Sequence, residues 1–219
     1  RSVLVEQDRA FVEQLWQLPA GTLRTDPGGG TVALFEAMSA GEIKACWIIC
    51  TNPVATVPNR QKVIAGLQQA ELVIAQDAFL DSETNRYADI LLPGALWAEA
   101  EGVMINAERN MTLMQQAVTP PGEALADWQI IARIACEMGY QEGFSYASAE
   151  AIFDEIRRAN NPATGYDIRG ASYRQLREGP VQWPCSPDNN RRRNPIRYLS
   201  DKAGAGIRFA TPGGRGQFF

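Results

Sequence analysis

A regular alternation of short apolar strands with a helix, between residues 45 and 92, constrains the fold of this chain more than any other feature. Apolar strands are expected at residues 45–50, 72–75 and 90–92, with a helix at 60–70. Apolar strands joined by helices form a parallel sheet covered on both faces, and right-handed crossovers place the strand ends at one edge. The pattern predicts an α/β fold with an open parallel, Rossmann-like sheet and flanking helices.

The segment at residues 87–109 ends the last of these strands abruptly. Its Ile-Leu-Leu run stops at Pro93, which cannot donate a hydrogen bond to a neighbouring strand. The residues that follow show neither helical spacing nor strand alternation, and they include Trp97 and three glutamates. We therefore expect a buried strand followed by a charged loop that meets a ligand, with a surface loop around one packed tryptophan as the alternative.

Outside this region the pattern predicts helices at residues 6–18, 31–40 and 149–159, with Thr31 as the cap of the second. Ser172 and Gln175 have the spacing of a capping box for a further short helix. The basic run at residues 191–193 is expected to be solvated surface.

Composition excludes several functions. The net charge is −4 with acids and bases mixed, so no basic face predicts a nucleic acid partner. No apolar run approaches the roughly 18 residues of a membrane span, and no signal-peptide pattern is present. The chain begins with Arg1 rather than methionine, and we expect it to be part of a longer polypeptide.

The residues needed for self-contained catalysis are also missing. There is no histidine, which excludes a Ser-His-Asp or Cys-His site within the chain. The four cysteines lack the C-x-x-C spacing of zinc or iron–sulfur ligands. Cys46 and Cys50 fall on one face of a predicted strand, and we expect both to be small core residues. We predict no catalytic residue and no metal ligand in this chain.

Polar residues stand where ligands bind in such sheets, outside the carboxyl ends of the strands. Asn52 follows the first strand, and Gln76 and Asp77 follow the second. Asn52 and Gln76 can donate and accept hydrogen bonds, but turn stabilisation explains them equally well. Asp127 precedes an apolar helix, where an N-cap role is at least as good an interpretation as ligand contact, and the two can coexist.

Several segments occur in the order used by the molybdenum bis-(molybdopterin guanine dinucleotide) oxidoreductases. They are residues 47–53 (WIICTNP), 71–89 (ELVIAQDAFLDSETNRYAD), 87–109 (YADILLPGALWAEAEGVMINAER), 121–140 (PGEALADWQIIARIACEMGY) and 179–185 (GPVQWPC). The chain thus resembles that family from about residue 9 to its last residue. The TNP and QWPC segments are most similar to the assimilatory nitrate reductases, with the formate dehydrogenases close behind.

The resemblance implies a cofactor site. Asn52, Gln76, Asp77 and Asp127 match positions that contact molybdopterin guanine dinucleotide in similar enzymes. Guanine presents N1–H and an exocyclic amine side by side, and one carboxylate, from Asp77 or Asp127, can accept from both. Ala100 stands where the family commonly has a lysine, which removes one expected contact.

The charged residues around Ala100 are expected to have a structural role. Glu99, Glu101 and Arg109 are interpreted as an ion-pair cluster that holds the loop.

The resemblance also implies a domain plan. Residues 1–140 are expected to form part of a molybdopterin guanine dinucleotide-binding domain. Residues 141–219 are expected to form a helix and loop extension toward a C-terminal domain outside this chain.

The implied parent enzyme is a cytoplasmic nitrate reductase of nitrate assimilation, which reduces nitrate to nitrite with two electrons. Its expected cofactors are molybdenum bis-molybdopterin guanine dinucleotide and a 4Fe-4S cluster whose ligands lie outside this chain. Its expected partners are the remainder of the catalytic subunit and an electron donor such as ferredoxin, flavodoxin or an NAD(P)H-linked subunit. We expect this chain alone to be inactive. The alternatives are a fragment of a formate dehydrogenase alpha subunit and a non-catalytic scaffold subunit.

Overall fold

The computed structural model describes residues 1–219 except 163, 189–190, 194–208, 210 and 219, so part of the expected C-terminal extension lies outside the described residues. The chain divides into two compact units. The sheet unit comprises Asp26–Ala100 and Gln116–Ser145. The hairpin unit comprises Arg1–Thr25, Glu101–Gln115 and Tyr146–Phe219. The expected division at residue 140 stays a prediction.

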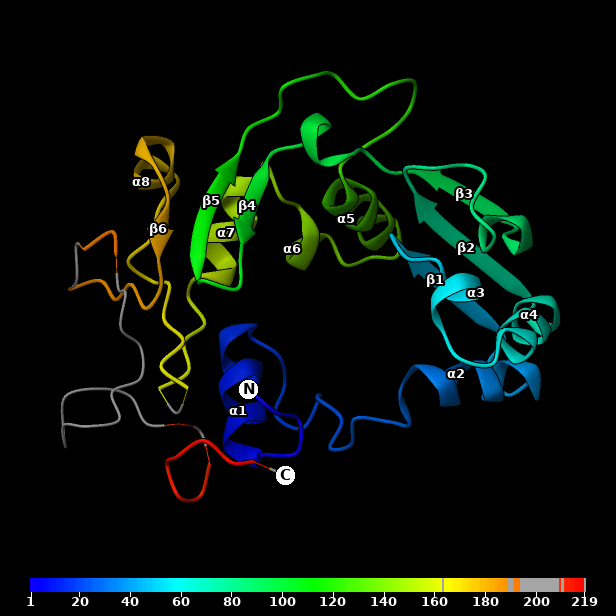
Figure 1. Cartoon of the computed structure of the whole chain (residues 1–219), viewed down its shortest axis with the longest axis horizontal. Coiled ribbons are helices and arrows are strands. Elements are labelled where there is room, and N and C mark those ends of the chain that lie inside the picture. Colours follow the sequence, from blue (N-terminus) through cyan, green and yellow to red (C-terminus); the bar gives the residue numbers. More distant parts are fainter. Residues whose placement is uncertain (163, 189–190, 194–208, 210, 219) are drawn as a thin grey trace. The chain divides into compact units, whose positions relative to one another are not determined.

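The sheet unit contains the predicted alternation of strands and helices (Figure 1). Its strands are β1 (Ala45–Ile49), β2 (Leu72–Asp77) and β3 (Ile90–Pro93). Its helices are α2 (Gly30–Ser39), α3 (Pro53–Thr56), α4 (Arg60–Gln69), α5 (Asp127–Glu137) and α6 (Gln141–Phe144), with short 3-10 turns η1 (Asn85–Tyr87) and η2 (Trp97–Glu99).

The three strands pair in parallel in the order β1-β2-β3. Trp47 lies opposite Ile74, and Ile74 lies opposite Ile90, so these residues share one face of the sheet. Parallel pairing places the ends of β1, β2 and β3 at the same edge, as the alternation predicts. The predicted α/β class with an open parallel sheet and flanking helices is confirmed.

The core of the sheet unit lies between the sheet and helices α2 and α4, which lie side by side (Figure 1). It is a buried apolar cluster of Phe35, Met38, Ile48, Val54, Val63, Leu67 and Val73. The opposite face is less covered, since Ile49 is 36% exposed and Ile90 is 44% exposed. The expectation that the strand at 90–92 is buried was therefore wrong, because β3 is the last strand in the described order and lacks a neighbour on one side.

The hairpin unit holds α1 (Glu6–Leu15), α7 (Ala149–Ile156) and α8 (Tyr173–Glu178), together with β4 (Gly102–Ile105), β5 (Asn110–Met114) and β6 (Val181–Gln182). Its strands are antiparallel in the order β4-β5-β6. The prediction that residues 97–109 form a loop was therefore wrong for residues 102–105, which form β4 and pair with β5. A buried apolar cluster that includes Met111, Phe153 and Tyr173 joins this sheet to α7 and α8.

Helix ends follow local chemistry. The Ser172 hydroxyl accepts from the Gln175 N–H, which confirms that predicted cap, and Ser148 caps α7 in the same way. The other boundaries differ from expectation. Gln17 adopts a left-handed conformation (φ 56°) and ends the first helix early, and α2 begins at Gly30 without a side-chain cap from Thr31. Predicted helices thus exist where expected, while their ends depend on single backbone conformations.

Candidate functional site

The ends of β1 and β2 meet the first residue of α5, and this junction contains two of the predicted site residues. Gln76, near the end of β2, is only 1% exposed. Its Nε2 donates a hydrogen bond to Asp127 Oδ1 over 2.7 Å. The two residues are 51 positions apart in sequence, so the fold brings together what the sequence separates.

Asp127 does not cap α5, so the N-cap interpretation was wrong. Ala126 occupies the N-cap position, and its N–H donates to the Gln129 side chain. Asp127 is instead the first helical residue, where a negative charge is favoured by the helix dipole. Because Gln129, rather than Asp127, accepts the hydrogen bond from the N-cap N–H, the Asp127 carboxylate remains available for contacts at the strand ends.

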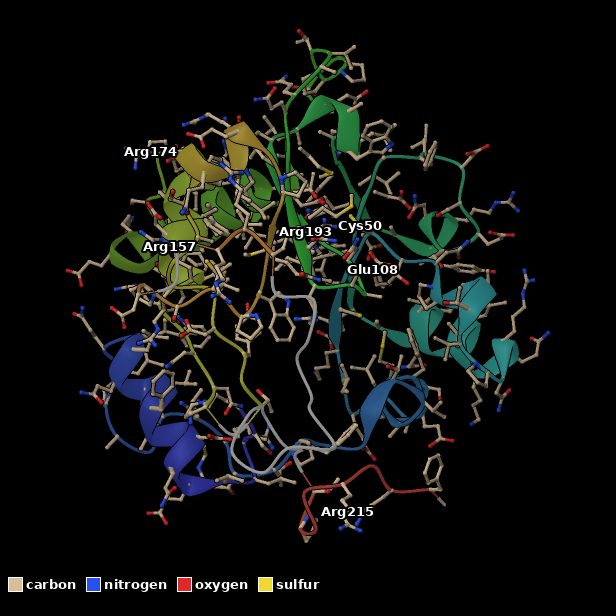
Figure 2. The ribbon with its side chains drawn as sticks, turned by 60° about the vertical axis from the view of Figure 1, so that its left-hand side comes forward. Cys50, Glu108, Arg157, Arg174, Arg193 and Arg215 are labelled. Atoms are coloured by element: carbon tan, nitrogen blue, oxygen red, sulfur yellow. The ribbon has the colours of Figure 1, made fainter. Side chains whose placement is uncertain are left out.

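Cys50 is a third residue of this junction, and sequence reasoning placed it in the core. It is exposed and follows β1 directly (Figure 2). Its backbone is left-handed (φ 50°), which ends the strand alternation. Its Sγ donates to Asp127 Oδ1 over 3.3 Å. Partial desolvation of the sulfur, the hydrogen bond to Asp127 and the charges of Asp127 and Asp77 raise the pKa of the Cys50 thiol to about 11. Cys46 does pack against the core, as predicted.

The junction has spare hydrogen-bonding capacity. Gln76 Oε1 is buried and has no partner among the described residues. The two described donors to the Asp127 carboxylate, Cys50 Sγ and Gln76 Nε2, both bind Oδ1. The other oxygen, Oδ2, accepts no hydrogen bond from the described residues. A buried polar atom without a partner is costly and rare, which makes it a marker of a binding site. Gly94 leaves room here, since a Cβ at that position would lie 3.2 Å from Asp127 Oδ1.

Asn52 and Asp77 lie at the same strand ends but organise the loop after β2. Asn52 Nδ2 donates to Glu83 Oε2 over 2.6 Å, and Asn52 Oδ1 accepts from the Thr84 hydroxyl over 2.6 Å. The hydrogen bond from Asn52 is the main reason that the pKa of Glu83 is lowered. Asp77 accepts from the Phe79 N–H. Both side-chain polar atoms of Asn52 and both of Asp77 thus have partners within the unit, in contrast to Gln76 Oε1 and Asp127 Oδ2.

Sequence reasoning missed Thr84 and Asn85, which tie this loop together. Thr84 is fully buried, and its hydroxyl also accepts from the Val54 N–H. Asn85 Nδ2 donates to Asp77 Oδ2 and to the Phe79 carbonyl. Their position within a polar loop after a strand was the available signal, but sequence gives no sign of which loop residues turn inward.

Two of the charged residues after β3, Glu99 and Arg109, have described hydrogen-bond partners. Glu99 accepts from the Leu96 N–H over 2.8 Å. In the hairpin unit, Arg109 donates to the Trp183 carbonyl, and its guanidinium lies 5.7 Å from the centre of the Trp183 ring. The expected ion-pair cluster of Glu99, Glu101 and Arg109 stays a prediction.

Within the described residues, no group of three or more His, Cys, Asp or Glu side chains lies close enough together to hold a metal ion. In the same part of the chain, no helix has the length and apolar character needed to cross a membrane.

The fold and the junction define a class of protein. An open parallel sheet with an amide and a carboxylate at its strand ends is typical of α/β domains that bind nucleotides and related cofactors. The family model described as molybdopterin oxidoreductase matches residues 5–137. The chain therefore belongs to the molybdopterin oxidoreductase family, as the sequence motifs predict. Membership of this family implies a molybdenum–pterin cofactor.

Known proteins are similar along most of the chain. A nitrate reductase from Synechocystis sp. is 35% identical over 221 residues, covering 100% of this chain and 30% of that protein. An F420-dependent formate dehydrogenase subunit alpha from Methanocaldococcus jannaschii is 34% identical, covering 98% of this chain and 29% of that protein. Acetylene hydratase from Pelobacter acetylenicus is similar in structure, with a TM-score of 0.62 and 26% identity over 84% of this chain and 23% of that one. The chain thus spans about 30% of the length of the nitrate reductase and of the formate dehydrogenase subunit.

Proposed function

We propose that this chain supplies part of the guanine-nucleotide site of a molybdenum bis-molybdopterin guanine dinucleotide oxidoreductase. The observation that carries the proposal is the junction of Gln76 with Asp127, where a buried amide oxygen and a carboxylate oxygen lack partners among the described residues. Guanine offers N1–H and an exocyclic amine on one edge, and both are donors. The two acceptors Gln76 Oε1, near the end of β2, and Asp127 Oδ2, at the start of α5, are complementary to that edge.

The residues of the junction have separate tasks in this proposal. Asp127 accepts from the guanine edge through its Oδ2 atom, while Gln76 and Cys50 fix the carboxylate through Oδ1. Asn52 and Asp77 hold the loop after β2 and present their remaining acceptor capacity to the ribose or the base. Molybdenum, when the cofactor is bound, supplies the two-electron chemistry, and this chain contributes binding and orientation.

The parent reaction that we propose is reduction of nitrate to nitrite in the cytoplasm, as part of nitrate assimilation. Similarity to a nitrate reductase over the full length of the chain supports it, as do the TNP and QWPC segments. The electron donor in this proposal is ferredoxin, flavodoxin or an NAD(P)H-linked subunit, and a 4Fe-4S cluster lies outside the chain. The second candidate is a formate dehydrogenase, which the 34% identity to such an enzyme favours. The purified chain is expected to reduce no nitrate by itself.

Calorimetric titration of the purified chain with GDP tests the nucleotide site, because GDP represents the nucleotide half of the cofactor. We expect GDP to bind at least about tenfold more tightly than ADP, since adenine presents an acceptor where guanine has N1–H. Asp127→Asn places an amide donor against the guanine donors and is expected to weaken GDP binding by about 10–100-fold.

Asp81→Asn is the matched control, because it removes one exposed carboxylate from the same unit. Equal affinity of the chain for GDP and ADP, or equal GDP affinity of the Asp127→Asn and Asp81→Asn variants, would contradict the proposed site. A separate assay of the full-length enzyme distinguishes a nitrate reductase from a formate dehydrogenase. It compares nitrate-dependent oxidation of a reduced viologen dye with formate-dependent reduction of the oxidised dye.

A further inference from the structure

Cys50 differs from the other cysteines of this chain, all four of which the structure describes. It is exposed, whereas Cys46 and Cys136 are partly covered and Cys185 is buried. Its N–H donates to the Gln76 carbonyl over 2.8 Å, so its backbone still belongs to the β1–β2 pairing. The left-handed conformation then turns its side chain out of the strand alternation and onto Asp127.

We propose that Cys50 is a positioning residue of the nucleotide site and the point at which that site can be covalently blocked. The thiol holds the Asp127 carboxylate for a guanine-type ligand, and a group attached to the thiol excludes that ligand. This inference rests on the proposed function, because it assigns the ligand of the same junction.

The hydrogen bonds around Asp127 give Cys50 its positioning role. Both described donors to the carboxylate, Cys50 Sγ and Gln76 Nε2, use Oδ1. Two hydrogen bonds to Oδ1 from different directions fix the orientation of the whole carboxylate, including Oδ2. The carboxylate therefore loses little further rotational freedom when Oδ2 binds a ligand. Removal of the thiol leaves Gln76 as the single described donor.

A second observation points to a ligand at the same place. The Gln76 amide that donates to Asp127 also carries the buried oxygen without a described partner. A thiol, a carboxylate and an unsatisfied amide therefore meet at one strand-end junction. This combination distinguishes Cys50 from an isolated surface cysteine.

The same neighbours restrain the reactivity of the thiol. Partial desolvation of the sulfur and the nearby carboxylates raise the pKa of Cys50, so at neutral pH the side chain is a thiol rather than the nucleophilic thiolate. Alkylation by iodoacetamide forms a sulfur–carbon bond, breaks the carbon–iodine bond, and releases iodide and the thiol proton. The product lacks the S–H donor and adds bulk beside Asp127.

Two effects on binding are expected in calorimetric titrations with GDP. Cys50→Ala removes the donor and is expected to weaken GDP binding by about fivefold. Cys50→Ser restores a donor, and its affinity is expected to lie within about twofold of the wild type. Alkylated wild type is expected to lose GDP binding, while the Cys50→Ala variant treated with the same reagent retains the affinity that it had before treatment. Equal thermal midpoints of the alanine and serine variants separate positioning from folding.

Protection is the reciprocal test, followed by mass spectrometry of the peptide that contains Cys50. Saturating GDP is expected to slow alkylation of Cys50 at least about fivefold, and the concentration of ADP needed for the same protection is expected to be at least about tenfold higher. Asp127→Asn removes a negative charge from beside the thiol, which lowers its pKa, and is expected to speed alkylation about threefold without any ligand.

The outcomes separate the two proposals. If the wild type binds GDP in preference to ADP, but Cys50→Ala binds it equally well or GDP gives no protection, the role of Cys50 is overturned and the nucleotide site stands. If the wild type binds no GDP, both are overturned. An alkylation rate that Asp127→Asn leaves unchanged refutes the thiol–carboxylate contact itself.

Discussion

Replacement of Gly66 by alanine tests the packing that holds the sheet unit together. Gly66 lies in α4 where it faces α2, and a Cβ there would lie 3.0 Å from both Met38 Cβ and the Phe35 carbonyl oxygen. Carbon atoms in good contact are about 3.5–4.0 Å apart, so the two helices must separate. Met38 is fully buried, and the Phe35 oxygen belongs to the backbone, so neither moves easily.

Two opposing effects set the magnitude. Alanine favours a helix over glycine by about 1 kcal/mol, whereas one extra methyl group in a packed core costs about 1–3 kcal/mol. We expect Gly66→Ala to lower the free energy of unfolding by about 1 kcal/mol. Gly143→Ala is the matched control in α6, because a Cβ there meets nothing within 4 Å. It is expected to be neutral or to stabilise by up to about 1 kcal/mol.

Urea unfolding followed by tryptophan fluorescence and circular dichroism measures this difference. Coincident transitions and equal slopes for the variants are needed for the comparison of unfolding free energies. If Gly66→Ala stabilises the chain as much as Gly143→Ala does, the close approach of α2 and α4 does not exist and the reasoning is refuted.

Three further predictions concern single contacts. Thr84→Val leaves two buried polar groups without their partner and should cost about 1–3 kcal/mol of unfolding free energy, while Thr84→Ser should restore most of it in the same urea assay. Gly94→Ala pushes the Asp127 carboxylate and should weaken GDP binding by about 3–10-fold with an unchanged thermal midpoint, and unchanged affinity would contradict the crowding. Glu13 accepts from the Leu23 N–H, which lowers its pKa, so its contribution to stability is complete above its ordinary pKa of 4.5 and is lost as the pH falls through the lowered value. Unfolding measured from about pH 5 to about pH 3 should therefore show a smaller loss for Glu13→Gln than for the wild type, and parallel curves would refute it.

Much of the sheet unit is predictable from sequence because its signals are local. The apolar runs of β1, β2 and β3 and the helix between β1 and β2 each appear within a short window, and parallel pairing follows from the connections. The same logic placed Gln76 and Asp77 at the edge of the sheet where the strands end. What it did not predict is that β3 has an exposed face, because exposure depends on which strand is last in the sheet.

The hairpin of β4 and β5 was missed because its turn lacks the usual sequence signal. Asn-Gly or Asp-Gly marks most tight hairpins, whereas here Arg109 takes the left-handed conformation (φ 69°). A distant contact supports it, since the Trp183 carbonyl, 74 positions away, accepts from the Arg109 side chain. No window of sequence around Arg109 contains that partner.

The left-handed turn at Cys50 was missed for a similar reason. Alternation along β1 predicts a side chain on the same face as Cys46, and one positive φ angle reverses that prediction. The contact with Asp127 spans 77 positions. The sequence identifies the edge of the sheet where the strands end, but the pairing of side chains across that edge depends on where α5 begins.

The junction at Asp127 connects binding to the order of the sheet. Its carboxylate touches the end of β1 through Cys50 and the end of β2 through Gln76, while the Gly94 N–H after β3 donates to the Asp77 carbonyl. A shift of any one strand therefore moves an acceptor of the proposed nucleotide site. If these contacts hold the nucleotide end of a cofactor, as proposed, substitutions here are expected to change how much cofactor the full enzyme retains. The activity of the full enzyme per bound molybdenum should stay constant across such variants, and a changed value would show that these residues act on the substrate.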